Sequence, residues 1–330
     1  MIAVSQSDLH RMRDALFVEG PAARGRLTRF WALLLLAAVI ATAGVVADST
    51  ATVIGAMIVA PLMTPILGIV LAIALGDRTN LVRSLVLVVV GAGAVVLVGY
   101  LLGLLSAVDV VAPGNGQVAA RVSPRTVDLI AALATGAVGA FALVRSDVSD
   151  TLPGVAIAIS LVPPLSVVGL TLEAGRGDQA RGALLLFLTN VAAILFTGVV
   201  VMAMYRVRST ALANPPPYGT RTVGTRYPVV LIVAFVVIVA VPLVLSGRRY
   251  TSSTLATDHV AKLAADWAAP AQWDVVSAEY RDGRVVVRAV GPKPAPDPAQ
   301  LRRRLDANGE KGTAVSLELV PEQRVELPPR

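Results

Sequence analysis

Cysteine is absent from this chain of 330 residues, which excludes disulfide bonds, thiolate metal sites and cysteine nucleophiles. Charge is scarce as well: 15% of the residues are charged, against about 25% in a typical soluble domain. Hydrophobic residues make up 55% of the chain, and its mean hydropathy is +0.71. Together these values exclude soluble, disordered and collagen-like proteins. They predict a polytopic membrane protein.

Other absences narrow the function. Both histidines, His10 and His259, lie outside the long apolar runs, and those runs contain no chain of carboxylates and no arginine ladder. A carboxylate-relay proton pump, a voltage sensor and a haem or metal centre are therefore not expected. The sequence also has no nucleotide-binding loop and no nucleophile–base pair, so we expect neither an enzyme nor a cofactor or metal.

The apolar runs predict an all-α bundle of about seven transmembrane helices, because a span needs about 20 mostly apolar residues. The predicted spans are residues 30–47, 52–75, 84–105, 127–144, 152–172, 183–205 and 228–245. They divide the chain into an N-terminal segment 1–29, a transmembrane domain 30–246 and a tail 250–330.

Arginines between the spans predict the orientation. If the N-terminus is cytoplasmic, the inner segments hold 12 arginines and the outer loops hold 4. An excess of basic residues marks the cytoplasmic side. We therefore expect a bacterial cytoplasmic membrane protein with its N-terminus inside and, after seven spans, its tail outside. The basic pI near 10.2 is explained by these flanking arginines, so no nucleic-acid partner is expected.

The tail has the composition of a soluble α+β domain. Helical spacing over 254–268 precedes two strand-like segments, 273–280 and 284–290, which flank an Asp-Gly pair typical of hairpin turns. A second helix is predicted over 298–308, with strands over 313–320 and 324–327. The expected role is docking or oligomerisation.

An internal repeat relates two halves of the transmembrane domain. Residues 48–76 align without a gap on residues 147–175, and the residue numbers of each pair differ by 99. Polar, glycine and proline positions coincide, as in Gly55 with Gly154 and Pro65 with Pro164. Each unit holds three spans, about 30–105 and about 127–205, so the second enters the membrane from the opposite side. The sequence thus predicts a 3+3 inverted repeat, with span 7 leading to the tail.

Prolines interrupt the second span of each unit. A helical proline lacks its N–H and frees the carbonyl four residues earlier, here those of Met57, Pro61, Ile159 and Ser160. Broken spans at matching positions of inverted halves are typical of transporter binding sites. The candidate binding residues are Pro61, Thr64, Pro65, Ser160, Pro163, Pro164 and Asn190, with Ser166 nearby. The alternative is a pair of kinks that the hydroxyls close without any ligand.

Acidic residues precede both broken spans. Asp48 precedes the first, and Asp147 and Asp150 precede the second. They are gate candidates, although capping of the following helix is the simpler explanation of their positions. Asn190 has the same two interpretations, as a substrate contact or as a polar link between helices.

These same segments resemble the two signature blocks of the bacterial domain of unknown function 389 family, over about residues 30–205. The matching positions are Ser49, Gly55, Pro61, Pro65 and Gly68, then Pro153, Gly154, Pro163, Pro164, Gly169, Phe187 and Asn190. Thr64 departs from the glycine expected there. The resemblance implies an architecture but no reaction and no substrate.

Two functions fit these observations. The first is a secondary transporter or channel-like permease for an ion or small polar solute, with its site at the broken spans. The second is a non-transporting membrane scaffold or sensor whose tail binds a partner. In either case we expect a homo-oligomer in the lipid bilayer. A wet cavity lined by hydroxyls and amides favours the first, and a dry core favours the second.

Overall fold

The computed structural model describes residues 4–106, 109–123, 126–145, 161–213, 257, 259–281 and 284–321. The chain divides into two compact units, Met1–Val244 and Leu245–Arg330. The first unit is a helical bundle and the second is a small domain with a β-sheet.

Four helices of the bundle are long and apolar enough to cross a membrane: α2 (Ala23–Val46), α5 (Arg78–Leu104), α7 (Thr126–Val144) and α10 (Gly177–Met204). The pair α3 (Thr50–Val59) and α4 (Met63–Leu75) is bent by 43° and makes a fifth span if it is counted as one. By length and composition, the described residues therefore contain four or five spans instead of seven. The predicted span 228–245 and the first half of 152–172 lie outside the described residues.

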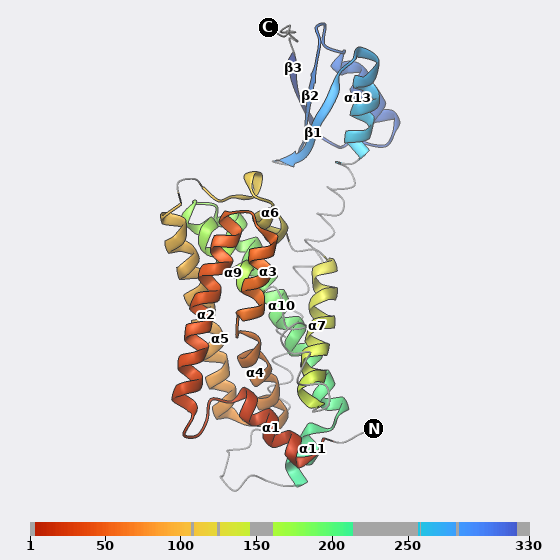
Figure 1. Ribbon diagram of the computed structural model, residues 1–330. Helices are drawn as coiled ribbons and strands as arrows, with labels where there is room; N and C mark the ends of the chain where they lie inside the picture. The colour runs from red at the N-terminus through yellow and green to blue at the C-terminus, as the bar shows by residue number, and fades with distance from the viewer. Residues whose placement is uncertain are drawn as a thin grey trace, which may run out of the picture. The chain divides into compact units, whose positions relative to one another are not determined.

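Short helices lie at the two ends of the bundle (Figure 1). At one end are α1 (Gln6–Leu16) and α11 (Val207–Ala213), and at the other are a 3₁₀ turn, η1 (Ala112–Gly114), and α6 (Gly116–Val122). We call these the α1 end and the α6 end. Helix α1 is amphipathic and buries Met12 and Leu16 where it contacts α4.

Helix α4 and its counterpart α9 (Val162–Glu173) form the centre of the bundle. Every residue from Pro65 to Ile73 in α4 is buried, and so is every residue from Val162 to Thr171 in α9. A helix that is apolar on all sides is stable only when it is covered on all sides. Both helices contact α5 and α10, which supply part of that cover.

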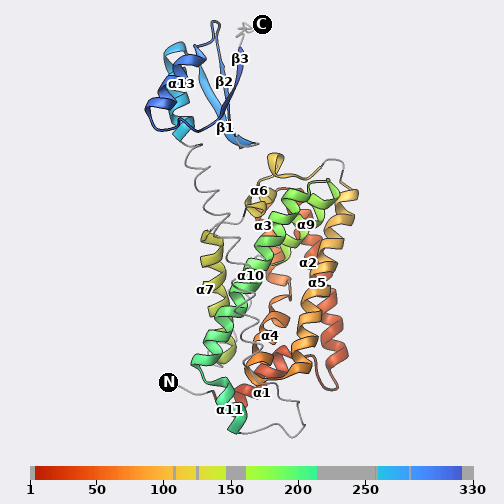
Figure 2. The ribbon, with the colours of Figure 1, turned by 180° about the vertical axis from the view of Figure 1, so that it is seen from behind.

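Helices α5 and α10 run in opposite directions (Figure 2). Helix α5 begins at the α1 end, where Asn80 contacts Glu19, and finishes at the α6 end, where Gly103 faces Glu173 of α9. Helix α10 begins beside Val122 of α6 and finishes next to Tyr205, whose carbonyl accepts from the N–H of Val4. Likewise, α4 ends at the α1 end and α9 ends at the α6 end.

The second unit is a three-stranded mixed sheet with helices. Strands β1 (Asp274–Arg281) and β2 (Arg284–Gly291) are antiparallel, and β3 (Val315–Pro321) pairs parallel to β2 after helix α13 (Pro298–Ala307). A further helix covers 259–268. The core members are Val260, Ala264, Trp267, Ala268, Trp273, Val285, Val287, Ala289, Leu301 and Leu305.

This order of elements matches the predicted helix, two strands, helix and strand. The predicted turn at residues 282–283 and the strand 324–327 lie outside the described residues. Both core tryptophans satisfy their indole donors, Trp267 on the Asp297 carbonyl at 3.0 Å and Trp273 on the Pro292 carbonyl at 2.6 Å. Buried indoles usually find such a partner.

Candidate functional site

The first predicted break lies between α3 and α4. Helix α3 ends at Val59, Pro61 and Leu62 form a turn, and α4 begins at Met63 with Pro65 in its first turn. Because Pro61 has no N–H, the carbonyl of Met57 has no donor four residues later. The Pro61 carbonyl was expected to be free, but it accepts from the Thr64 N–H at 3.2 Å.

The second break is described from Leu161 onward. Helix α9 begins at Val162, so Pro163 and Pro164 occupy its first turn and both are buried. A missing N–H costs little there, because the first-turn N–H groups have no partner within the helix. The prolines thus begin a half-helix and do not kink a continuous one. Ser160 and the carbonyl of Ile159 lie outside the described residues.

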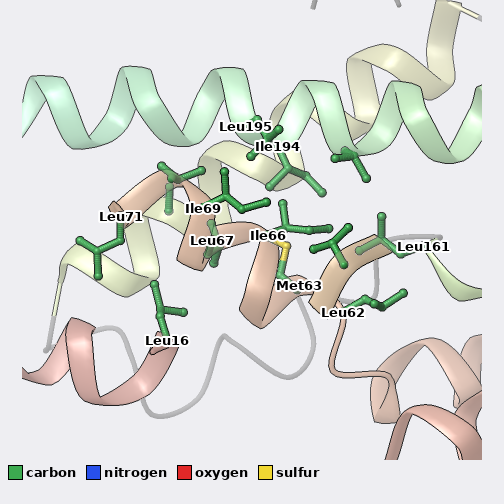
Figure 3. Packing of buried hydrophobic residues seen from close by; sticks show 14 of the residues in the cluster. Leu16, Leu62, Met63, Ile66, Leu67, Ile69, Leu71, Leu161, Ile194 and Leu195 are labelled. Atoms are coloured by element: carbon green, nitrogen blue, oxygen red, sulfur yellow. The ribbon is translucent and has the colours of Figure 1, made fainter. Parts of the chain in front are cut away.

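The two half-helices begin in the same apolar cluster. Leu62 and Leu161, which correspond in the predicted repeat, precede α4 and α9 without a side-chain cap, and both are buried. Figure 3 shows them together with Met63, Ile66 and Ile194. The described surroundings of the two breaks are therefore apolar.

Some of the candidate site residues are buried, and others lie on the surface of the bundle. Asn190 is 4% exposed in α10, beside Thr189, whose hydroxyl donates to the Leu185 carbonyl at 2.8 Å. Thr64 is exposed, and Pro61 is half-buried. The structure thus brings Pro65, Pro163, Pro164 and Asn190 into the interior but leaves Thr64 on the surface of the bundle.

Among the described residues of the bundle, two buried hydroxyls have no hydrogen-bond partner. They belong to Thr42 of α2 and Ser166 of α9, and both side chains are 0% exposed. Ser166 lies in a segment that the sequence already placed beside the break. No sequence pattern singled out Thr42, since a single hydroxyl in an apolar run usually bonds to its own helix.

Asp48 connects the end of α2 to α6. It does not cap α3, because Ser49 does so by accepting from the Thr52 N–H at 3.4 Å. The Asp48 carboxylate instead accepts from the Gln117 N–H at 2.8 Å, at the start of α6, and its φ of 50° is one that aspartate tolerates better than most residues. Burial lowers the pKa of the Arg121 guanidinium, while the charge of Asp48 acts to raise it. Asp147 and Asp150 lie outside the described residues.

The α6 end is tied to α2 by a second residue. The Asn115 amide donates to the carbonyl of Val45, in the last turn of α2, at 2.7 Å. Its oxygen accepts from the Val118 N–H at 2.9 Å and so caps α6. At the start of α10, Gln179 accepts from the Ala112 N–H at 3.0 Å.

The α1 end is tied to α7 in the same way. Arg11 donates to the carbonyl of Leu143, in the last turn of α7, at 3.0 Å. Nearby, the Arg13 guanidinium lies 3.5 Å from the Glu19 carboxylate and 4.0 Å from that of Asp77. Asn80 donates to both carboxylates. A side chain at each end thus holds a peripheral helix against the end of a long helix.

These long apolar helices indicate an integral membrane protein. The family model described as Domain of unknown function (DUF389) matches residues 57–196. An uncharacterised protein of Methanocaldococcus jannaschii is 32% identical over 175 residues, which are 53% of this chain and 53% of the relative. The chain thus spans about half the length of this curated relative. No solved structure matches this chain.

The match of this family model to residues 57–196 confirms the resemblance carried by the two sequence blocks. The family assignment agrees with the membrane bundle and attaches no activity to it.

Proposed function

We propose that the protein is a secondary transporter or channel-like permease for an ion or a small polar solute. Its site lies where α4 and α9 begin. The observation that supports this function best is the placement of these half-helices, which are buried on nearly all sides and begin in one cluster. Discontinuous helices at the centre of a bundle are a recurrent way to build such sites.

An inverted repeat underlies this proposal, and the helix bounds support it. Helices α4 and α9 begin at Met63 and Val162, and α5 and α10 begin at Arg78 and Gly177, so each pair differs by 99 residues. Each of these helices runs oppositely to its counterpart. Gly76 and Gly175, also 99 residues apart, follow α4 and α9 with left-handed φ values of 71° and 69°.

The peripheral helices support the repeat too. Arg11, before span 1, bonds to the end of α7 in the second half, whereas Asn115, before span 4, bonds to the end of α2 in the first half. A residue that precedes each half thus holds the end of a helix from the other half. In the proposed cycle, one tie loosens while the other holds, so that the centre opens to one side at a time.

The proposed location and orientation follow from the arginines between the spans. The N-terminus lies in the bacterial cytoplasm and the tail outside, with no catalytic reaction and no cofactor. Helix α5 presents an exposed apolar face that includes Val82, Val89 and Leu97, with exposed fractions of 59%, 62% and 56%. Lipid or a second copy of the chain covers that face.

Solute flux tests the proposal directly. Purified protein in liposomes should move at least one member of a panel of labelled inorganic ions and small polar solutes faster than empty liposomes do. Replacing both Pro164 and Asn190 with alanine should reduce that flux at least about tenfold, because the first turn of α9 and the buried amide of α10 are both altered. If this variant moves the solute as fast as the native chain does, the pathway does not depend on Pro164 and Asn190.

The second candidate, a scaffold or sensor, is favoured by the apolar surroundings of the breaks. The tail offers a partner site of its own, a groove of about 640 Å³ lined by Trp273, Lys293, Pro294, Ala295, Leu319 and Pro321. If no solute moves at all, and a variant lacking the tail loses a co-purifying partner, the scaffold takes precedence over transport.

A further inference from the structure

We propose that α2 and α5 hold an anionic phospholipid at the α1 end of the bundle, with Arg24 and Arg83 on its headgroup phosphate. The ligand is a lipid of net negative charge, such as phosphatidylglycerol. This inference is independent of the proposed function, because a bound lipid requires no pathway for a solute.

Arg24 and Arg83 are exposed arginines that have no ion pair among the described residues. Their neighbours at the α1 end are engaged. Arg11 and Arg13 each face a carboxylate, at 3.4 and 3.5 Å, and Arg26 donates to three carbonyls of the segment 14–19. The two remaining cations are therefore available to an anion at the membrane surface.

Two contacts between α2 and α5 place these two arginines at one level of the bundle. At the base, the Asn80 amide donates to the Glu19 carboxylate. Further along, a Cβ on Gly91 would lie 3.1 Å from the Leu34 side chain and 3.6 Å from that of Phe30. In each helix the arginine lies between these contacts, and at 1.5 Å per residue it is about 12 Å along the axis from the second one. Figures 1 and 2 both show α2 and α5 side by side.

Helical rotation places both arginines on the same side of this pair of helices. Successive residues are turned by about 100° around the axis, so Arg24 is turned by about 100° from the direction in which Phe30 and Leu34 face α5. Arg83 is turned by about 80°, in the opposite sense, from the direction in which Gly91 faces α2. The two helices both begin at the α1 end and face each other, so opposite rotations bring the two arginines to one side.

Apolar side chains continue the face of each arginine along its helix. Trp31 follows Arg24 by seven residues, and Val90 follows Arg83 by seven, so each lies on the same face about 10 Å further along. Trp31 is half-buried and meets Phe30 edge-on, with ring centroids 5.5 Å apart, while Val90 is 51% exposed. Tryptophan is enriched at the membrane–water interface. The pair of helices thus offers positive charge at headgroup level and apolar surface for an acyl chain.

Charge and position together select the class of ligand. Guanidinium groups bind phosphate oxygens bidentately, and basic clusters between transmembrane helices recognise anionic headgroups. A soluble phosphate would use the arginines but not the apolar face. A zwitterionic lipid would use the apolar face, but its ammonium group offsets the charge of its phosphate. A phospholipid of net negative charge uses both features.

The test measures lipid binding on the purified full chain in detergent. Melting temperature is followed as phosphatidylglycerol replaces phosphatidylcholine at a constant total mole fraction of lipid, since a ligand of the folded state raises it with concentration. Phosphatidylglycerol should stabilise the native chain more than phosphatidylcholine does. Arg24→Gln and Arg83→Gln should each weaken its apparent affinity at least about fivefold, because each removes one of the two cations on the phosphate.

Arg29→Gln is the matched control. Arg29 is another exposed arginine of α2 without an ion pair among the described residues, but it is turned by about 140° around the helix from Arg24. The substitution removes the same net charge from the α1 end. Its phosphatidylglycerol affinity should stay within about twofold of the native value, because an exposed charge away from the site is screened. If Arg24→Gln does not fold, Arg83→Gln and Arg29→Gln still decide the matter.

Three results overturn the lipid site. Equal stabilisation by the two lipids would remove the preference for an anionic headgroup. An equal loss of affinity in Arg29→Gln would reduce the effect to diffuse attraction toward a basic end. Stabilisation by inorganic phosphate without lipid, lost in Arg24→Gln, would assign the arginines to a soluble anion. A loss confined to Arg24→Gln and Arg83→Gln, with no effect of inorganic phosphate, supports the bound phospholipid.

Discussion

Gly169→Ala is expected to destabilise the bundle severely. A Cβ at this position in α9 would lie 2.3 Å from the Val96 carbonyl oxygen and 2.6 Å from the Tyr100 nitrogen, both on the backbone of α5. Backbone cannot move aside as a flexible side chain can. On the other side of the same contact, a Cβ on Gly99 would meet the Ser166 carbonyl at 2.6 Å. The glycines therefore let the two helices approach closely.

The expected cost of Gly169→Ala is about 3 kcal/mol or more, at the upper end of overpacking effects. In a protein of this size that lowers the melting temperature by about 6 °C or more, measured in detergent by loss of the monodisperse species on heating. Gly93→Ala is the control, because a Cβ there meets nothing within 4 Å. Its melting temperature should hold or rise, since alanine favours the helix. Equal losses in both variants would contradict the close contact of α5 with α9.

Asp77→Ala is expected to have the second largest effect on stability. The Asp77 side chain is 3% exposed and accepts from the Asn80 N–H at 3.1 Å and from the Asn80 amide at 2.8 Å. Its removal leaves the start of α5 uncapped, and Arg13 loses one of two nearby carboxylates. We expect a loss of about 2–4 kcal/mol, combining a lost cap with unpaired buried polar groups.

Two variants separate the contributions of Asp77. Asp77→Asn keeps an oxygen that accepts from the Asn80 N–H, so it should recover part of the melting temperature. Asp178→Ala, in an exposed pair with Arg176 at 3.4 Å near the start of α10, should change little. If Asp77→Ala melts with the native chain, the charged cluster does not stabilise the α1 end.

The sequence predicted the four long spans because length and apolarity alone determine them. The described helices α2, α5, α7 and α10 each cover a predicted run, although α2 begins at Ala23 and so includes three flanking arginines. Apolarity does not show where a helix begins in the membrane–water interface. A basic residue can belong to the helix there, because its long side chain extends to the water.

Residues that act through tertiary contacts were harder to predict. Asp48 precedes α3 in sequence, but its carboxylate accepts from the N–H of Gln117, at the start of α6 and 69 positions away. Thr64 follows a proline break, yet it faces outward. Gly93 lies on open surface, whereas Gly91 and Gly99 of the same helix pack closely against their neighbours. Local pattern cannot distinguish the faces of a helix that is apolar all round.

The sheet of the tail shows the same limit. Alternation and the Asp-Gly pair predicted the β1–β2 hairpin, since both signals are local. The parallel pairing of β2 with β3, which joins Val285 to Val315, depends on the crossover through α13, and no local pattern specifies it.

Opposite orientation of the two halves is the central claim, and thiol labelling tests it most directly. The native chain lacks cysteine, so Thr79→Cys and Asp178→Cys each introduce a single thiol, at exposed positions 99 residues apart at the starts of α5 and α10. A membrane-impermeant reagent applied to intact cells should label Asp178→Cys alone, and both variants after permeabilisation. Labelling of both variants from the same side would show that the halves run parallel and would remove the basis of the central site.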